Sequence, residues 1–219
     1  VVIILPINSK GIIVISQPSA KDWQAPTKPQ WLQSLAEEEI CFDMDAVVPL
    51  DPTSLIYWAC KKTGLSDFGE DYWREPFEIL CQSLDREADL TLMGRLMARN
   101  DILLWLQSRL QVLDIVKQHP EILEEEIKAP VVIVGLPRSG TSILFEVLSQ
   151  DQQFGVPQAW EAIFPCPPPE AASYDDDPRI ARAHAIETQW NRVCPEFATM
   201  HEMGGKIPAE CGHIMAGSF

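Results

Sequence analysis

Residues Val131–Gln150 read VVIVGLPRSGTSILFEVLSQ, and this stretch decides the fold that the sequence predicts. Its first four residues are all apolar, which is typical of a short strand buried on both faces of a parallel sheet. Gly135–Gly140 predicts a tight turn, and from Thr141 the apolar side chains recur with helical spacing. A strand, a glycine-bounded loop and a helix together predict a cradle for an anion. The glycines let the backbone approach the anion, and the first helical N–H groups point at it.

The two glycines of this loop have the spacing of the nucleotide-triphosphatase loop, G-x-x-x-x-G-K-[ST]. Thr141 stands where that motif has Lys, and the positive charge lies earlier, on Arg138. A planar guanidinium suits a bidentate grip on two anionic oxygens. The residues therefore favour an anion-binding loop over magnesium-dependent triphosphate hydrolysis. A nucleotide phosphotransferase or hydrolase remains an alternative.

The sequence GLPRSGTS, after a β-run, resembles the 5′-phosphosulfate loop of sulfotransferases, which bind 3′-phosphoadenosine 5′-phosphosulfate (PAPS). Leu50–Gly69, Leu80–Pro120 and the Trp160–Glu161 pair are also similar to the bacterial-type sulfotransferase family, so the resemblance covers residues 45–219. It implies a loop that holds the cofactor through Gly135, Pro137, Arg138, Ser139, Gly140, Thr141 and Ser142. In this family an Arg and a Ser after the next strand hold the 3′-phosphate, and neither is found in this sequence.

The predicted fold class is α/β, with a P-loop-like parallel sheet core that is incomplete in this chain and an N-terminal helical layer. Residues 1–44 are interpreted as an N-terminal extension and linker that can be disordered. Residues 45–219 are interpreted as a sulfotransferase-like domain, with a helical part over 45–130 and a truncated nucleotide-binding α/β part over 131–219. The chain is thus expected to be a fragment that lacks its C-terminal part.

Helix start and stop signals place several elements around the loop. Asp51 predicts an N-cap, Pro52 a first helical position and Gly64 a stop. The other expected elements are helices over Pro76–Glu87, Leu90–His119, Pro120–Ile127, Gln158–Phe164 and Pro178–Val193, and a very short strand over Phe154–Val156. The acidic run before Pro178 is interpreted as a helix cap. Three indoles are predicted to be core residues: Trp58, Trp73 and Trp105.

Charge and composition exclude some functions. The 17 basic and 32 acidic residues give a net charge of −15, which argues against nucleic acid as a partner. Six scattered cysteines are typical of reduced thiols in a cytoplasmic protein. The apolar stretch Val1–Ser16 is too short and too interrupted for a stable membrane span, and it lacks the features of a signal peptide.

Two residues are candidates for the catalytic base that takes a proton from the acceptor. Glu161 follows the loop helix, where family members that use a carboxylate base carry a Glu, and His201 is the second choice because imidazole titrates in the right range. The other histidines are interpreted as structural, and the spacing of Cys211, His213 and His201 matches no common zinc site, so no metal is predicted.

The predicted function is transfer of a sulfuryl group from PAPS to a hydroxyl or amine. The apolar, Trp-rich surroundings favour a small-molecule, lipid or glycan acceptor. A non-catalytic nucleotide-binding fragment is the alternative from a different functional class. Oligomeric state, and whether the chain as given is active, stay open.

Overall fold

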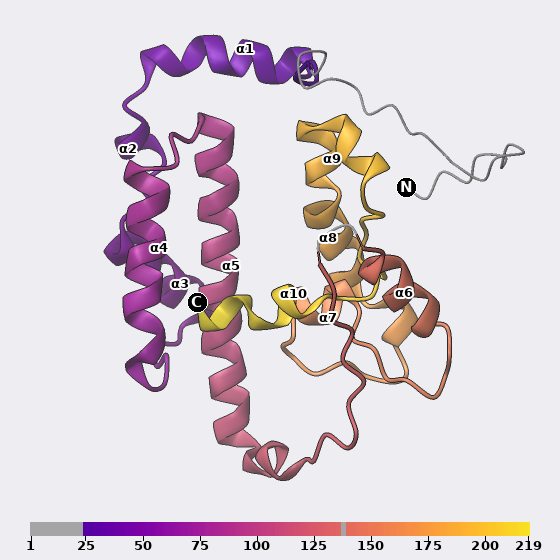
Figure 1. Ribbon diagram of the computed structural model, residues 1–219. Coiled ribbons are helices and arrows are strands. Elements are labelled where there is room, and N and C mark those ends of the chain that lie inside the picture. The colour runs from indigo at the N-terminus through magenta and orange to yellow at the C-terminus, as the bar shows by residue number, and fades with distance from the viewer. Residues whose placement is uncertain (1–23, 137–138) are drawn as a thin grey trace, which may run out of the picture.

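A computed structural model describes residues 24–136 and 139–219, and this part of the chain is helical. Its first half comprises α1 (Gln30–Glu38), α2 (Met44–Val47), α3 (Pro52–Thr63), α4 (Arg74–Arg86) and α5 (Leu92–Gln118). Its second half comprises α6 (Thr141–Leu148), α7 (Ala159–Ile163), α8 (Pro178–Glu187), α9 (Gln189–Val193) and α10 (Cys211–Met215). Short 3-10 turns occupy Glu39–Cys41, Asp71–Trp73, Pro120–Glu124, Tyr174–Asp176, Pro195–Thr199 and Ala216–Ser218. The long helix α5 is the centre of the arrangement, with α3 and α4 on one side and α7, α8 and α9 on the other (Figure 1).

Two of the helices predicted in the first half have the boundaries expected, while two others differ: the helix predicted from Pro76 begins at Arg74, and the one predicted over Pro120–Ile127 is a 3-10 turn over Pro120–Glu124. Asp51 Oδ2 accepts a hydrogen bond of 2.7 Å from Ser54 N, Pro52 takes the first helical position, and Gly64 ends α3 with φ of +74°. The helix predicted over Leu90–His119 is α5, which begins after Thr91 and ends at Gln118. Because these signals are local in sequence, they specify a helix without help from the rest of the fold.

The main core lies where α3, α4 and α5 meet. Its buried members are Leu55, Ala59, Phe68, Trp73, Phe77, Cys81, Ile102, Leu106 and Leu110. Arg95 of α5 is also buried, and its guanidinium is paired with Asp85 at 2.6 Å and donates to the Val48 carbonyl at 3.1 Å. Such pairing is what permits a cation in a core.

Of the three tryptophans predicted to be in the core, Trp73 is fully buried and Trp105 packs against the core while partly exposed. The prediction is wrong for Trp58, whose side chain is 46% exposed and carries the Lys61 ammonium 4.6 Å above its ring. Trp58 lies on the solvent side of α3, where a cation can cover an indole face.

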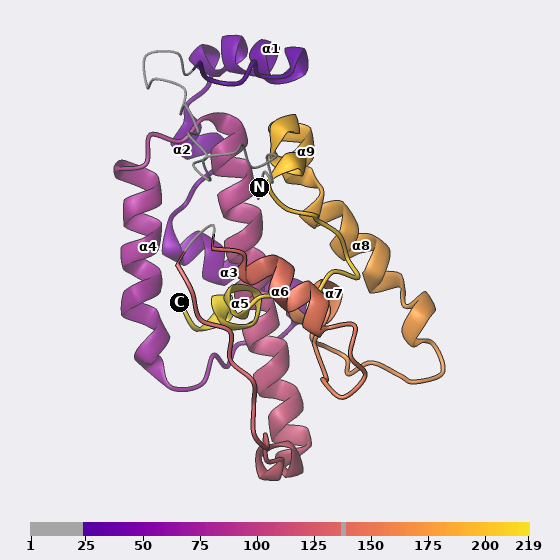
Figure 2. The ribbon, with the colours of Figure 1, turned by 45° about the vertical axis from the view of Figure 1, so that its right-hand side comes forward.

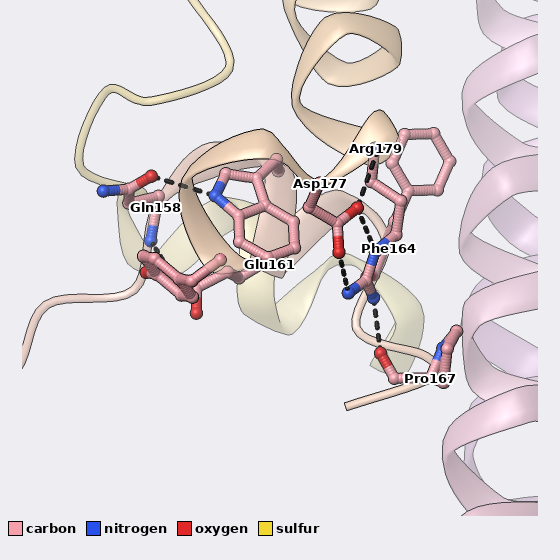
Figure 3. Close-up of polar contacts among 8 residues, drawn as sticks. Gln158, Glu161, Phe164, Pro167, Asp177 and Arg179 are labelled. Atoms are coloured by element: carbon pink, nitrogen blue, oxygen red, sulfur yellow. Dashed lines mark hydrogen bonds and ion pairs between the residues drawn. The ribbon is translucent and has the colours of Figure 1, made fainter. Parts of the chain in front are cut away.

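A second, smaller core joins α7 and α8 to the side of α5. Trp160 and Ala183 are buried there, and Leu104 of α5 packs against them. Asp177 caps α8 and forms a two-pronged pair with Arg179, whose guanidinium also donates to the Phe164 carbonyl at 3.0 Å and to the Pro167 carbonyl (Figure 3). The acidic run is thus a helix cap, as predicted, and its Arg partner fixes the Pro-rich segment between α7 and α8.

The predicted helix over Pro178–Val193 is divided at Thr188 into α8 and α9. At the N-terminus, where sequence reasoning assigned an extension and linker, helix α1 is formed from Gln30. Figure 2 shows α1 lying across the ends of the other helices rather than packing along them. The apolar stretch Val1–Ser16 lies outside the described residues.

The predicted sheet is not observed in residues 24–136 and 139–219, which contain no strand. Val131–Val134 is an irregular segment, and the side chain of Val134 is 87% exposed. A strand exists only when a neighbour completes its hydrogen bonds, and no described segment lies beside this run to do so. The predicted strand at Phe154–Val156 is likewise absent from the structure, and a single antiparallel bridge between Gln158 and Pro208 is present nearby.

Candidate functional site

The N-terminus of α6 is the centre of the candidate site. Gly140 is its N-cap with φ of +97°, a left-handed conformation that favours glycine, and no side chain caps the helix. The first intrahelical bond runs from Leu144 N to the Gly140 carbonyl at 3.1 Å. The N–H groups of Thr141, Ser142 and Ile143 therefore have no helical acceptor and stay available to an anion.

Gly135 lies close against residues at the start of α6. A Cβ at Gly135 would lie 2.7 Å from Ser139 Oγ and 2.8 Å from Thr141 Cγ2, distances shorter than any normal contact. Ser139 closes the turn by donating from N at 3.1 Å and from Oγ at 2.6 Å to the Leu136 carbonyl. Pro137 and Arg138, the other predicted cofactor-binding residues, lie outside the described residues.

Ser142 contacts a residue that sequence reasoning missed. Its Oγ donates a 3.0 Å hydrogen bond to Oε1 of Glu210, which lies just before α10. A carboxylate next to a helix N-terminus is stabilised by the helix dipole, in the same way as an anionic ligand would be. Glu210 therefore competes with any anion that uses the Ser142 hydroxyl. No sequence signal predicted this contact, because it joins residues 68 positions apart.

Glu161, the first candidate for the base, is held at the start of α7. Its Oε2 accepts from Gln158 N at 2.8 Å (Figure 3). The same oxygen accepts from the Tyr174 hydroxyl at 2.9 Å. Burial, reinforced by the bond to Glu161, raises the pKa of Tyr174 to about 12, so Tyr174 stays a donor near neutral pH. The neighbouring Trp160 is buried and donates from Nε1 to Gln158 Oε1 at 2.9 Å. The carboxylate therefore has a fixed position.

Residues 204–209 connect α7 with the other parts of the site. Trp160 N donates to the Gly205 carbonyl at 2.9 Å, and Ala159 N to the Ile207 carbonyl at 2.8 Å. A Cβ at Gly205 would lie 2.4 Å from the Ile180 carbonyl oxygen, so only glycine lets this segment pass so close to α8. The segment leads directly to Glu210 and to α10, which packs on α7.

The histidines have different surroundings. His201, the second candidate for the base, is half-buried, and its ring lies 6.4 Å from that of Phe197. His213, which sequence reasoning interpreted as structural, lies on α10 with its Nε2 3.3 Å from Oε1 of the largely buried Glu187. The hydrogen bond to Glu187 raises the pKa of His213. This pair ties α10 to α8.

The described residues contain no group of three or more His, Cys, Asp and Glu placed to hold a metal ion. All six cysteines are free thiols. Within the same described ranges, no helix is long and apolar enough to cross a membrane. Two features can take part in chemistry: a helix N-terminus with the hydroxyls of Ser139, Thr141 and Ser142 around it, and a fixed carboxylate, Glu161, on α7, the next helix along the chain.

Residues 130–219 match the sulfotransferase family. The resemblance to sulfotransferases is therefore confirmed for the part of the chain that holds the cradle, α7 and α10. No curated protein matches the chain.

Two solved structures of sulfotransferases extend the likeness. Sulfotransferase STF1 from Mycobacterium tuberculosis H37Rv matches with a TM-score of 0.65 and 30% identity over 77% of this chain and 47% of its own. Sulfotransferase STF9 from Mycobacterium avium matches with a TM-score of 0.62 and 25% identity over 77% of this chain and 44% of its own. This share of the chain exceeds residues 130–219, so the structural likeness to sulfotransferases includes part of the helical half. The chain spans less than half the length of either relative.

Proposed function

We propose that this chain binds PAPS at the α6 N-terminus and transfers its sulfuryl group to a hydroxyl or amine of an acceptor. The observation that carries the proposal is the uncapped start of α6, with Gly135 lying close against Ser139 and Thr141 in front of it. The sulfotransferase match over residues 130–219 supports it, because the same residues form the cradle. The parallel sheet that usually surrounds such a loop, and the cytoplasm as the compartment, remain parts of the proposal.

The residues present fit the phosphosulfate group. Gly135 and Gly140 allow the backbone to approach an anion, and the N–H groups of Thr141 and Ser142 are open donors next to two hydroxyls. The chain has a net charge of −15, so an anionic ligand needs a local positive charge, which Arg138 would supply. When bound, PAPS supplies an electrophilic sulfuryl group on a phosphate leaving group.

The remaining roles belong to side chains of this chain. The cradle donors would hold the leaving phosphate and stabilise the charge that develops on it. Glu161 would accept the proton of the acceptor at Oε1, because Oε2 already accepts bonds from Gln158 and Tyr174. His201 is the second candidate for this role. Ser142 would exchange its bond to Glu210 for a bond to the ligand.

Calorimetry with 3′,5′-adenosine bisphosphate tests the cradle. Arg138→Ala should weaken binding about 100-fold, because it removes a positioned cationic donor. Ser142→Ala should weaken it about 5-fold, because it removes one hydroxyl that donates to the ligand. Ser149→Ala is the matched control, since Ser149 lies at the other end of α6 and donates only to the Glu146 carbonyl. Unchanged binding in Arg138→Ala would refute the assignment. If ATP binds in the presence of magnesium and the bisphosphate does not bind, the phosphotransferase alternative is favoured.

Turnover tests the base. Glu161→Gln keeps an oxygen that can accept from Gln158 N but removes basicity, so kcat should fall about 100-fold or more while bisphosphate affinity stays normal. His201→Ala should mainly raise KM for the acceptor. The reverse pattern, with full turnover in Glu161→Gln and none in a folded His201→Ala, would exchange the two roles.

A further inference from the structure

A cavity of about 490 Å³ lies between α1, α4, α5 and α9, and no part of the proposed mechanism uses it. Its volume is in the range of small-molecule sites. The walls are almost wholly apolar and include Leu32, Leu84, Met97, Trp105 and Trp190. Such a lining takes an apolar body, because burying apolar surface on both sides removes it from water.

Two carboxylates, those of Asp101 and Glu39, interrupt this apolar wall. Asp101 of α5 lines the cavity, and no cationic side chain of the described residues pairs with it. Burial raises the pKa of Asp101 to about 6, and the negative charge of Glu187 adds to the effect. By contrast, the buried Arg95 on the same helix has carboxylate partners. Asp101 is therefore a partly desolvated carboxylate that lacks a counter-ion among the described residues.

The other charged residues around the cavity do not supply that counter-ion. Glu39 is a second carboxylate, and its Oε1 accepts a 2.7 Å bond from Leu92 N at the start of α5. Lys28 lies on the exposed rim, before α1, and forms no ion pair in the described part of the chain. Its ammonium can stay hydrated there. The cavity is thus an apolar space with two carboxylates, of which Glu39 already binds the Leu92 N–H.

We propose that this cavity binds an apolar molecule with a single cationic amine, and that the ammonium group pairs with Asp101. The pairing would offset the desolvation of the carboxylate, while the apolar body would displace water from the walls around Met97 and Trp190. An alcohol of the same shape could offer only a neutral hydrogen bond, and a carboxylate would be repelled. The inference goes beyond sulfuryl transfer, since it concerns binding alone and requires no activity at the α6 cradle.

The test is calorimetry at pH 8 with three ligands that share one chain: octylamine, 1-octanol and octanoate. At this pH Asp101 is ionised, because its pKa is about 6. Octylamine should bind about 10-fold or more tightly than octanol, in keeping with a charge-assisted bond in a site of low polarity, and octanoate most weakly. The measurement does not involve the PAPS site. A negative result here would therefore refute the amine-binding proposal and leave the proposed sulfuryl transfer untouched.

Variants locate the interaction. Asp101→Asn keeps the shape but removes the charge, so the affinity for octylamine should fall to that for octanol while octanol binding stays unchanged. Glu78→Gln is the matched control, because it makes the same change of charge at an exposed position of α4 outside the cavity. Ala36→Trp on α1 should fill the space and weaken all three ligands.

Three outcomes would overturn the proposal. The first is octylamine binding no more tightly than octanol to the wild-type protein, or no binding of any of the three. The second is an undiminished preference for the amine in Asp101→Asn, or an equal loss in Glu78→Gln, which would reflect the overall charge of −15. The third applies even if Asp101→Asn fails to fold. Unchanged octylamine affinity in Ala36→Trp would place the ligand elsewhere.

Discussion

Two regions of the molecule differ in how far they bury their apolar side chains: the bundle of α3, α4 and α5, and the segment from Val131 through α6. In the bundle, Leu106 and Phe77 are completely buried, and Phe219 from the C-terminal end also packs on the ring of Phe77. In the second segment, Val134 is 87% exposed and Ile143 of α6 is 66% exposed. The exposed segment has the more apolar sequence of the two, so apolar content alone does not decide burial.

The difference follows from the elements themselves. A helix completes its backbone hydrogen bonds internally and needs only a face to pack against, whereas a strand needs another strand for every bond. The three bundle helices supply faces to one another, while Val131–Val134 has no partner strand in the described residues. The predictions below measure how far the two regions differ.

The largest effect is expected in the bundle. Leu106→Ala should reduce the free energy of unfolding by about 3 kcal/mol, because it leaves a cavity in a closely packed core. Ile143→Ala, on exposed α6, should change it by less than about 0.5 kcal/mol. Urea unfolding followed by circular dichroism measures both. Equal losses would mean that α6 packs as tightly as the bundle and that the contrast is wrong.

The next effect concerns the segment that joins α7 to α8. Gly205→Ala places a methyl group 2.4 Å from the Ile180 carbonyl oxygen and should cost about 2 kcal/mol. Gly212→Ala in α10 is the control, because its Cβ would meet nothing within 4 Å. If both variants unfold at the same urea concentration as the wild-type protein, residues 204–209 do not pack on α8 as described.

A smaller effect is expected at the carboxylate of α7. Tyr174→Phe removes the hydroxyl that donates to Glu161 and should cost about 1 kcal/mol, measured by thermal unfolding. Tyr72→Phe, at a position that is 64% exposed, should have no measurable effect. Since Tyr174 fixes Glu161, a Tyr174→Phe variant with unchanged stability would show that the carboxylate is not held in this way.

The smallest effect depends on pH. The folded-state pKa of His213 is raised by Glu187, so the pair contributes stability fully below the ordinary histidine pKa of about 6.5 and loses it as pH rises through the folded value. His213→Gln should therefore lower stability by roughly 0.5 kcal/mol at pH 5.5 and by less at pH 8.5. His119→Gln removes the exposed pair with Glu121 as a control. A difference that grows with pH would contradict the assignment.

Much of the helical half could be predicted because its signals are local. Asp51, Pro52 and Gly64 each act within one turn of the helix they delimit, and the structure has α3 between them. The loop glycines and the start of α6 were predicted for the same reason. The break between α8 and α9 at Thr188 was not, because no glycine or proline marks it.

The candidate site was only partly predictable. Glu161 was identified as a candidate from its place after the loop helix, but its bond to Tyr174 joins residues 13 apart through a turn that the sequence does not specify. Glu210 and Glu187 were missed, since their partners Ser142 and His213 lie far away in sequence or on a different helix. Roles for Glu161, His201 and Arg138 stay predictions.

The sequence by itself determined the helices with their caps, the glycine loop before α6 and the likeness to sulfotransferases, because each depends on residues that are close together in the sequence. Only the tertiary structure decided which side chains are buried and which charges meet. It placed Glu210 against Ser142, left Asp101 without a cation beside an apolar cavity, and left Val131–Val134 without a partner strand in the described residues. The physical reason is that caps and turns depend on bonds within a few residues, whereas burial, strand pairing and the pKa of a group depend on whatever the fold brings next to it.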